Sequence, residues 1–245
     1  MPNDSGSYPP ADLPPSTGAH LKAVYARIIR ACQLGGRDPS QVTLIAVSKT
    51  FPVPNILAAY AAGQRAFGES YVSEAIAKIT AIAGESLAQP IEWHFIGPLQ
   101  SNKTRAVAEN FQWVHSVGRL NTAQRLSGQR PPGLGPLNIC VQVNISGEAS
   151  KSGVRPEELL PLAQQAATLP NLRLRGLMAV PEPTPDRARQ KARFAQLRQL
   201  KEELVKAGLD LDTLSMGMSD DLEAAIAEGA TLVRVGRAIF GERQP

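Results

Sequence analysis

The chain has 245 residues, which is enough to bury the core of one large domain or two small ones. A hydrophobic share of 43% and a charged share of 20% are ordinary for a soluble globular protein, and the apolar runs are too short to span a membrane. The two cysteines, Cys32 and Cys140, lie far apart in the sequence, so a disulfide framework is not expected. With no apolar signal-like N-terminus, this composition indicates a cytoplasmic protein.

The first sixteen residues differ from the rest of the chain. They are rich in Pro, Ser and Asp and poor in apolar side chains, a composition typical of disorder. We therefore expect residues 1–16 to be a disordered extension and residues 17–245 to form one domain. This domain starts with a helix whose apolar face runs from Leu21 to Cys32 and which stops at Gly35-Gly36.

From residue 44 onward, strand patterns alternate with helical patterns. The expected strands are residues 44–49, 66–69, 92–97, 113–117, 138–145, 172–180, 212–218 and 231–236. Helical segments separate them. Pro156 is placed to start one of these helices, and another, residues 219–229, has Ser219 as a possible N-cap and Gly229 as its stop.

This alternation predicts the fold. Neighbouring strands joined through helices must be parallel, because parallel neighbours need a crossover connection. Eight such repeats in this length predict an α/β protein that forms a single (β/α)8 TIM barrel. An open doubly wound sheet is the alternative, but it usually has a glycine-rich loop after its first strand, and SKTFPVP contains no glycine.

The net charge of +4 raises the question of nucleic-acid binding, and the densest charged stretch is residues 186–206. Within it Phe194, Leu197, Leu200 and Leu204 recur at helical spacing, so the charges fall on the outer face of an amphipathic helix. Phe194 is the only aromatic residue of the stretch. No nucleic-acid partner and no membrane partner are therefore expected.

Polar residues lie at the ends of several strands, and in TIM barrels these ends form the active-site rim. The first is Lys49, the expected last residue of the first strand. The others are Glu69, His94, Asn144, Ser215 and Arg234. A single polar strand end is equally compatible with a solvated side chain, but several on one rim indicate a pocket. We expect Lys49 to face this pocket and His94 and Asn144 to line it.

Lys49 could hold an aldehyde cofactor. A lysine among apolar strand neighbours loses hydration, which lowers the pKa of its amine, and a neutral amine can form a Schiff base. Pyridoxal 5′-phosphate (PLP) has an aldehyde and also a phosphate, which barrels often bind at the loops after strands seven and eight. Here those loops offer the hydroxyls of Ser215 and Ser219, the backbone of Gly236 and the side chain of Arg237. Ordinary turn chemistry is the alternative for both loops.

Arg234 lies in the apolar eighth strand, where an arginine is costly to bury without an acceptor. If it faces the ring nitrogen of PLP, that nitrogen stays unprotonated, because a guanidinium group only donates hydrogen bonds. The ring would then be a poor electron sink. The alternative for Arg234 is a structural ion pair with Glu69 or Glu182.

Six motifs carry a family resemblance: AVSKT, FGESYVSEA, WHFIGPLQSNK, ASKSG, LRGLMAV and LSMGMSDDLEAAIAEGATLVRVGRAIFG. In this order they resemble the YggS/PROSC family of PLP-binding proteins, also called PLP homeostasis proteins, over residues 31–241. The resemblance implies a barrel like the N-terminal domain of alanine racemase. It also implies that Lys49 carries the Schiff base, that Arg234 faces the pyridine nitrogen, and that Ser215, Gly236 and Arg237 contact the phosphate.

The family resemblance further implies a carrier or buffer of PLP in vitamin B6 and amino-acid balance, with no established turnover and hence no catalytic residues. We expect a cytoplasmic monomer whose partners are PLP and PLP-dependent apo-enzymes, and no metal site. The chain departs from the family at Ser70, where asparagine is common, and at Arg237, where threonine is common. An amino-acid racemase of the same fold is the alternative. It would need a second acid/base group, and Tyr71 is the one tyrosine near a strand end.

Overall fold

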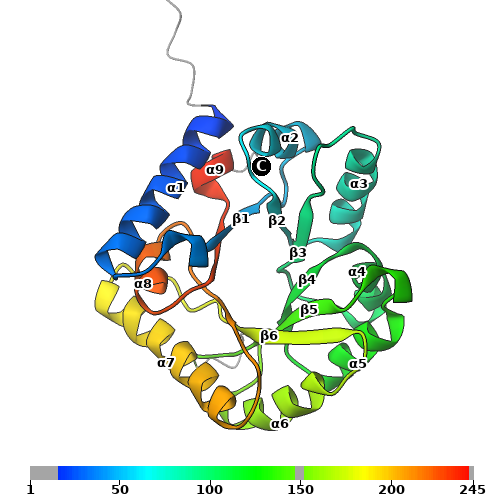
Figure 1. Ribbon diagram of the computed structural model, residues 1–245, viewed down its shortest axis with the longest axis vertical. Coiled ribbons are helices and arrows are strands. Elements are labelled where there is room, and N and C mark those ends of the chain that lie inside the picture. Colours follow the sequence, from blue (N-terminus) through cyan, green and yellow to red (C-terminus); the bar gives the residue numbers. More distant parts are fainter. Residues whose placement is uncertain (1–15, 147–151, 243–245) are drawn as a thin grey trace, which may run out of the picture.

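A closed eight-stranded barrel forms the centre of the molecule. The structure is a computed structural model that describes residues 16–146 and 152–242. Its strands pair in chain order and in parallel, and β1 also pairs with β8, so the sheet has no edge (Figure 1). This confirms the predicted barrel. Most of the expected extension, residues 1–15, lies outside the described residues.

The strands are β1 (Thr43–Val47), β2 (Ala66–Glu69), β3 (Glu92–Phe95), β4 (Trp113–Val117), β5 (Leu137–Gln142), β6 (Leu172–Met178), β7 (Thr213–Ser215) and β8 (Leu232–Val235). Each was expected within a few residues of these bounds. Two strands, β2 and β4, have the expected bounds, and the other six are shorter than the sequence suggested. The expected strands at 138–145 and 212–218 run past the observed ends because apolar residues continue into the loops that follow, and the one at 44–49 runs past because residues 48–51 form a turn.

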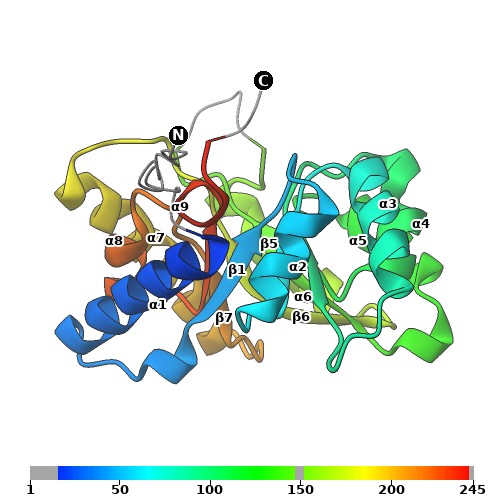
Figure 2. The same cartoon turned by 90° about the horizontal axis from the view of Figure 1, so that it is seen from above.

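Helices surround the barrel (Figure 2). They are α1 (Thr17–Leu34), α2 (Val53–Ala61), α3 (Val72–Ala83), α4 (Thr104–Asn110), α5 (Leu120–Gln129), α6 (Pro156–Ala167), α7 (Arg187–Lys206), α8 (Leu222–Ala227) and α9 (Arg237–Phe240), with 3₁₀ turns at Pro39–Gln41, Ser101–Lys103 and Pro132–Leu134. α1 precedes the barrel strands and packs against α8 and α9.

Helix ends follow their sequence signals in most places. Ser16 caps α1, since its Oγ accepts a hydrogen bond from the Ala19 amide, and Gly35 ends the helix as predicted. The predicted N-cap of α8 was wrong: the cap position is Asp221, because Met218 to Asp221 form a turn. Ser219 lies in this turn, and its carbonyl accepts a hydrogen bond from Arg27.

The core has two parts. A large apolar cluster fills the space between strands and helices, and Phe67, Phe95, Phe111 and Phe194 are fully buried in it. A small cluster lies inside the barrel and consists of Ile45, Ala66, Trp113, Cys140, Met178 and Leu232. His94, His115, Ser215 and Arg234 lie on the barrel strands and are buried polar residues. Strand alternation thus places apolar and polar side chains together inside the barrel.

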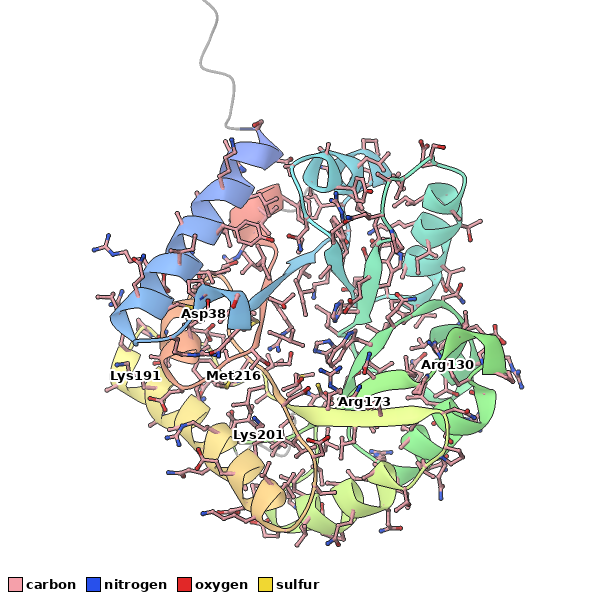
Figure 3. The ribbon with its side chains drawn as sticks, in the orientation of Figure 1. Asp38, Arg130, Arg173, Lys191, Lys201 and Met216 are labelled. Atoms are coloured by element: carbon pink, nitrogen blue, oxygen red, sulfur yellow. The ribbon has the colours of Figure 1, made fainter. Side chains whose placement is uncertain are left out.

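The amphipathic character of α7 was predicted correctly. Phe194, Leu197 and Leu204 are buried, whereas Lys191 is exposed at the outer edge of the molecule (Figure 3). Within the described residues, no helix has the length and apolarity needed to cross a membrane. Cys32 and Cys140 are both buried and free.

Candidate functional site

Lys49 lies in a turn, not in a strand. β1 ends at Val47, and the Phe51 amide donates to the Ser48 carbonyl at 3.0 Å, which closes a β-turn over residues 48–51. Thr50 has a φ of 69°, a conformation that β-branched residues rarely adopt. The prediction that Lys49 ends the strand was therefore wrong by two residues. The half-buried Lys49 does lie at the predicted end of the barrel.

Backbone alternation relates Lys49 to Arg234. Ile45 belongs to the cluster inside the barrel, and a Cβ on the neighbouring Gly68 would meet both Ile45 and Val47, so these two residues share the inner face. Ile45 is in register with Arg234 on β8. Val47, the last residue of β1, therefore lies two positions beyond Arg234, about 7 Å along the strands at about 3.3 Å per residue, and Lys49 follows two residues later in the turn.

Arg234 is buried inside the barrel, with 4% of its surface exposed. Its Nη1 donates to Ser215 Oγ at 2.5 Å and its Nη2 to the Ala179 carbonyl at 2.8 Å. Burial lowers the pKa of the guanidinium to about 10. The ion pairs considered for Arg234 do not form: Glu69 pairs with Lys78, and Glu182 pairs with Arg193.

A row of hydrogen bonds continues from Arg234 across the barrel interior. Ser215 Oγ lies 2.7 Å from His115 Nδ1, and His115 Nε2 lies 3.0 Å from His94 Nδ1. His94 Nε2 in turn lies 3.0 Å from Glu92 Oε1. Burial lowers the pKa of both histidines, and the bond to His94 lowers the pKa of Glu92.

These protonation states fix the direction of the row. An ionised Glu92 beside His94 Nε2 favours a proton on that nitrogen, so the neutral His94 accepts at Nδ1 from His115 Nε2. His115 Nδ1 is then an acceptor, and Ser215 donates its one hydroxyl proton to it. The Ser215 oxygen remains free to accept from Arg234. The hydrogen bonds from Arg234 to His94 are thus satisfied, whereas His94 Nε2 and Glu92 Oε1 make a close polar contact without hydrogen-bond alignment.

His94 therefore lies deep in the barrel, stacked on Trp113 at a ring distance of 5.5 Å, and its expected place in the pocket stays a prediction. Sequence reasoning missed His115. It lies where the pairing register between β4 and β5 shifts, between Val114 and Val117. His115 is two residues after Trp113, so strand alternation places both side chains inside the barrel and is the signal that could have identified it.

Gly236 and Arg237 lie beside the Lys49 turn. A Cβ on Gly236 would be 3.2 Å from the Val47 carbonyl, so the chain after β8 passes closely by the end of β1. The ring of Phe51, in the Lys49 turn, packs against Phe240 of α9 at 5.1 Å. The segment predicted to contact a phosphate and the predicted attachment point therefore meet at the same end of the barrel.

Arg237 and Asn144, the last two predicted site residues, bond to other parts of the protein in this structure. The Arg237 guanidinium is more than half exposed and pairs with Asp220 at 2.6 Å. Asn144 is half-buried after β5, and its backbone N–H donates to the Val154 carbonyl at 2.9 Å. This backbone contact keeps Asn144 close to the end of β5.

A separate cavity of about 550 Å³ lies on the outside of the barrel, between α1, α7 and α8. Its wall contains four basic side chains, those of Arg27, Arg30, Arg187 and Lys191. Asp220 also lines the cavity and accepts a hydrogen bond from Arg237. Because α1, α7 and α8 belong to the helix layer, this cavity is distinct from the strand end at which Lys49 lies.

Known proteins share this architecture. Residues 20–244 match the family model of the alanine racemase N-terminal domain. The pyridoxal phosphate homeostasis protein of Pseudomonas aeruginosa is 62% identical over 224 residues, which cover 91% of this chain and 94% of that protein. This chain belongs to the pyridoxal phosphate homeostasis protein family. The member from Escherichia coli strain K12 is 52% identical over 229 residues, covering 91% of this chain and 95% of that protein.

Two solved structures have a fold similar to that of this homeostasis protein. PipY of Synechococcus elongatus, solved with PLP bound, matches with a TM-score of 0.80 and 38% identity, covering 92% of this chain and 100% of PipY. Alanine racemase from Corynebacterium glutamicum matches with a TM-score of 0.66 and 18% identity, covering 91% of this chain and 62% of the racemase. The second match shows a shared barrel fold.

Proposed function

We propose that this protein binds PLP through Lys49 and takes part in PLP homeostasis. The observation that carries the proposal is the register between β1 and β8, which puts the inward-facing end of β1, two residues before Lys49, just beyond the buried Arg234. A lysine in the turn after β1 and an arginine inside the barrel can hold an aromatic ring between them. The names of the relatives and the PLP in PipY support the same ligand.

Arg234 fits the ring nitrogen of PLP. A guanidinium has five N–H groups. Two of them bind Ser215 Oγ and the Ala179 carbonyl, which leaves donors for a further acceptor. A pyridine nitrogen without a proton is such an acceptor. The row of hydrogen bonds to His94 would hold Arg234 in place for this contact.

The phosphate would lie near the start of α9. The close approach of Gly236 to Val47 brings backbone amides beside the Lys49 turn, and Arg237 adds a cation once it leaves Asp220. Ser215 is less available, because its only proton is donated to His115 in the observed arrangement. Ser215 can donate to a phosphate only if His115 changes its tautomer.

When bound, PLP supplies an aldehyde that reacts with a primary amine and a pyridine ring that can act as an electron sink. Arg234 donates to the ring nitrogen and keeps it unprotonated, which weakens the electron sink. We infer that the protein stores and releases the cofactor without turnover, in agreement with relatives that are named for homeostasis rather than for a reaction. An amino-acid racemase is the second candidate, because the fold is shared with alanine racemase.

The remaining parts of the proposal concern location and partners. Two buried free cysteines agree with a reducing cytoplasm. The protein would act as a monomer and pass PLP to apo-enzymes that need it. Light scattering of the purified protein tests the monomer, and reactivation of an apo-enzyme by the PLP-loaded protein tests the transfer.

The central experiment identifies the attachment residue. The protein is incubated with PLP, reduced with borohydride and digested, and mass spectrometry locates the modified lysine. We expect the label on Lys49, no visible-light absorption by bound PLP in Lys49→Ala, and normal binding in Lys206→Ala, which removes an exposed lysine at the end of α7.

Two results would change the conclusion. Label on other lysines, with Lys49→Ala binding PLP like the wild type, would refute the role of Lys49. Racemisation of added D- and L-amino acids above about 1 per second, measured by chiral chromatography, would replace the carrier by the racemase.

A further inference from the structure

Lys78 is the one lysine that is buried among the described residues, with 6% of its surface exposed. It belongs to α3, whose other buried residues, Ala75 and Ile82, are apolar. A lysine is rarely buried unless its charge is paired. The groups that pair with Lys78 therefore indicate why it is there.

The ammonium group of Lys78 has three hydrogen-bond partners, one for each proton. Its Nζ lies 2.8 Å from Glu69 Oε1, 2.5 Å from Glu74 Oε1 and 2.8 Å from the Ser48 carbonyl. Glu69 is fully buried, and Glu74 is partly exposed one helical turn before Lys78. The buried cation is thus fully satisfied.

The same groups hold the residues on both sides of Lys49. The Ser48 hydroxyl donates to Glu69 Oε1 at 2.7 Å, and the Thr50 amide donates to Glu74 Oε1 at 2.6 Å. Ser48 and Thr50 are therefore connected to one ammonium group through two carboxylates. We call this set of Ser48, Thr50, Glu69, Glu74 and Lys78 the turn clamp.

The turn clamp lies behind the strand that leads to Lys49. Ile45 and Val47 face the inside of the barrel, so the next residue, Ser48, faces the helices, where Lys78 lies. The bonds of the turn clamp to Ser48 and Thr50 act on Lys49 by fixing the backbone on either side of it.

The turn needs such support, because Thr50 is left-handed. A φ of 69° places the Cβ of a threonine too close to the backbone, and the conformation persists only if neighbouring contacts enforce it. The bond from the Thr50 amide to Glu74 and the bond from Lys78 to the Ser48 carbonyl are such contacts.

We propose that Lys78, Glu69 and Glu74 are positioning residues that hold the turn of Lys49 in its PLP-binding geometry. This inference rests on the proposed attachment of PLP to Lys49. Without the turn clamp, Thr50 relaxes toward negative φ, and the backbone of Lys49 rotates with it. The amine then meets its ligand in a fraction of the molecules, so that affinity falls by that fraction.

The test uses paired substitutions at Glu74, which is accessible enough for both variants to fold. Glu74→Ala removes the acceptor of the Thr50 amide, whereas Glu74→Gln keeps an acceptor oxygen in the same place. PLP dissociation constants are measured by the visible absorption of bound PLP, and borohydride trapping with peptide mapping measures occupancy of Lys49. We expect Glu74→Ala to weaken binding about tenfold, equal to about 1.4 kcal/mol, and Glu74→Gln to stay within about threefold of the wild type.

Lys78→Met tests the centre of the turn clamp, and Arg130→Met is its control. Arg130 is also a buried cation, and it bonds to the carbonyls of Ala108 and Phe111 on the α4 and α5 side of the barrel, away from β1 (Figure 3). Both variants lose folding stability in urea titrations, but only Lys78→Met is expected to lose PLP affinity at conditions where both remain folded.

The outcomes separate the two proposals. Trapping at Lys49 in the wild type, together with equal PLP affinity in the wild type and Glu74→Ala, overturns the positioning role and leaves the attachment intact. The absence of trapping at Lys49 in the wild type overturns the attachment, and the positioning role falls with it. If Lys78→Met does not fold, the Glu74 pair alone decides.

Discussion

His115 should make the barrel sensitive to acid. Its ring is fully buried, and burial holds its pKa well below the usual value of 6.5. The unfolded chain therefore binds a proton that the folded chain does not, once the pH falls below about 6.5. The stabilising contribution of the neutral ring is fully present above this pH and is lost as the pH falls toward the folded-state pKa.

The size of the effect follows from linkage. A histidine with an unfolded pKa of 6.5 that stays neutral in the fold costs about 1.4 kcal/mol of stability between about pH 7.5 and about pH 5.5. His115→Phe removes this contribution. It also leaves His94 Nδ1 and the Ser215 hydroxyl without their buried partner, so we expect it to lower the free energy of unfolding at neutral pH by about 2–4 kcal/mol.

Urea titrations at the two pH values measure both quantities. The wild type should lose about 1.4 kcal/mol more than His115→Phe on acidification, while Ser215→Ala, which keeps His115 buried, should retain the wild-type pH dependence. An identical loss in the wild type and His115→Phe would refute the assignment of a neutral buried ring.

Two further substitutions test the packing and the surface near α9. Gly176→Ala should prevent stable folding or lower the free energy of unfolding by more than about 3 kcal/mol, because its Cβ would lie 1.9 Å from the Thr213 carbonyl. Gly133→Ala is the control, since nothing lies within 4 Å of a Cβ there. Urea titration compares the two variants, and equal stability would contradict the prediction. Asp220→Ala should change the free energy of unfolding by less than about 1 kcal/mol, because the ion pair between Asp220 and Arg237 is exposed. It should also tighten PLP binding, measured by titration, because Arg237 becomes available for the phosphate. Weaker PLP binding in Asp220→Ala would count against a phosphate contact by Arg237.

The barrel was predictable because alternation and strand number are properties of the sequence itself. The eight strand patterns located the strands to within a few residues, and the segment after strand eight lies beside the end of the first, as expected. The turn at Lys49 was not predictable, because the positive φ of Thr50 depends on contacts with Glu74 in another element.

Within the candidate site, the sequence predicted which residue types matter but not which of them already have partners. Ser215 was expected to meet a phosphate, and its hydroxyl is engaged with His115 and Arg234. His115 and Lys78 were missed for a common reason. Each is a polar residue whose burial is offset by partners in other elements: His115 contacts His94 and Ser215, and Lys78 contacts Glu69 and the Ser48 carbonyl.

The place of Lys49 outside the barrel ladder has a consequence for release. A protein that buffers a cofactor must let it go as readily as it takes it up. The turn of residues 48–51 can open by breaking a few side-chain bonds, while the strands of the closed sheet stay paired. The lifetime of the bound state can therefore be set by a small local fluctuation whose frequency is independent of global unfolding. Amide hydrogen exchange at Thr50 and Phe51, faster than at Ile45, would be its direct signature.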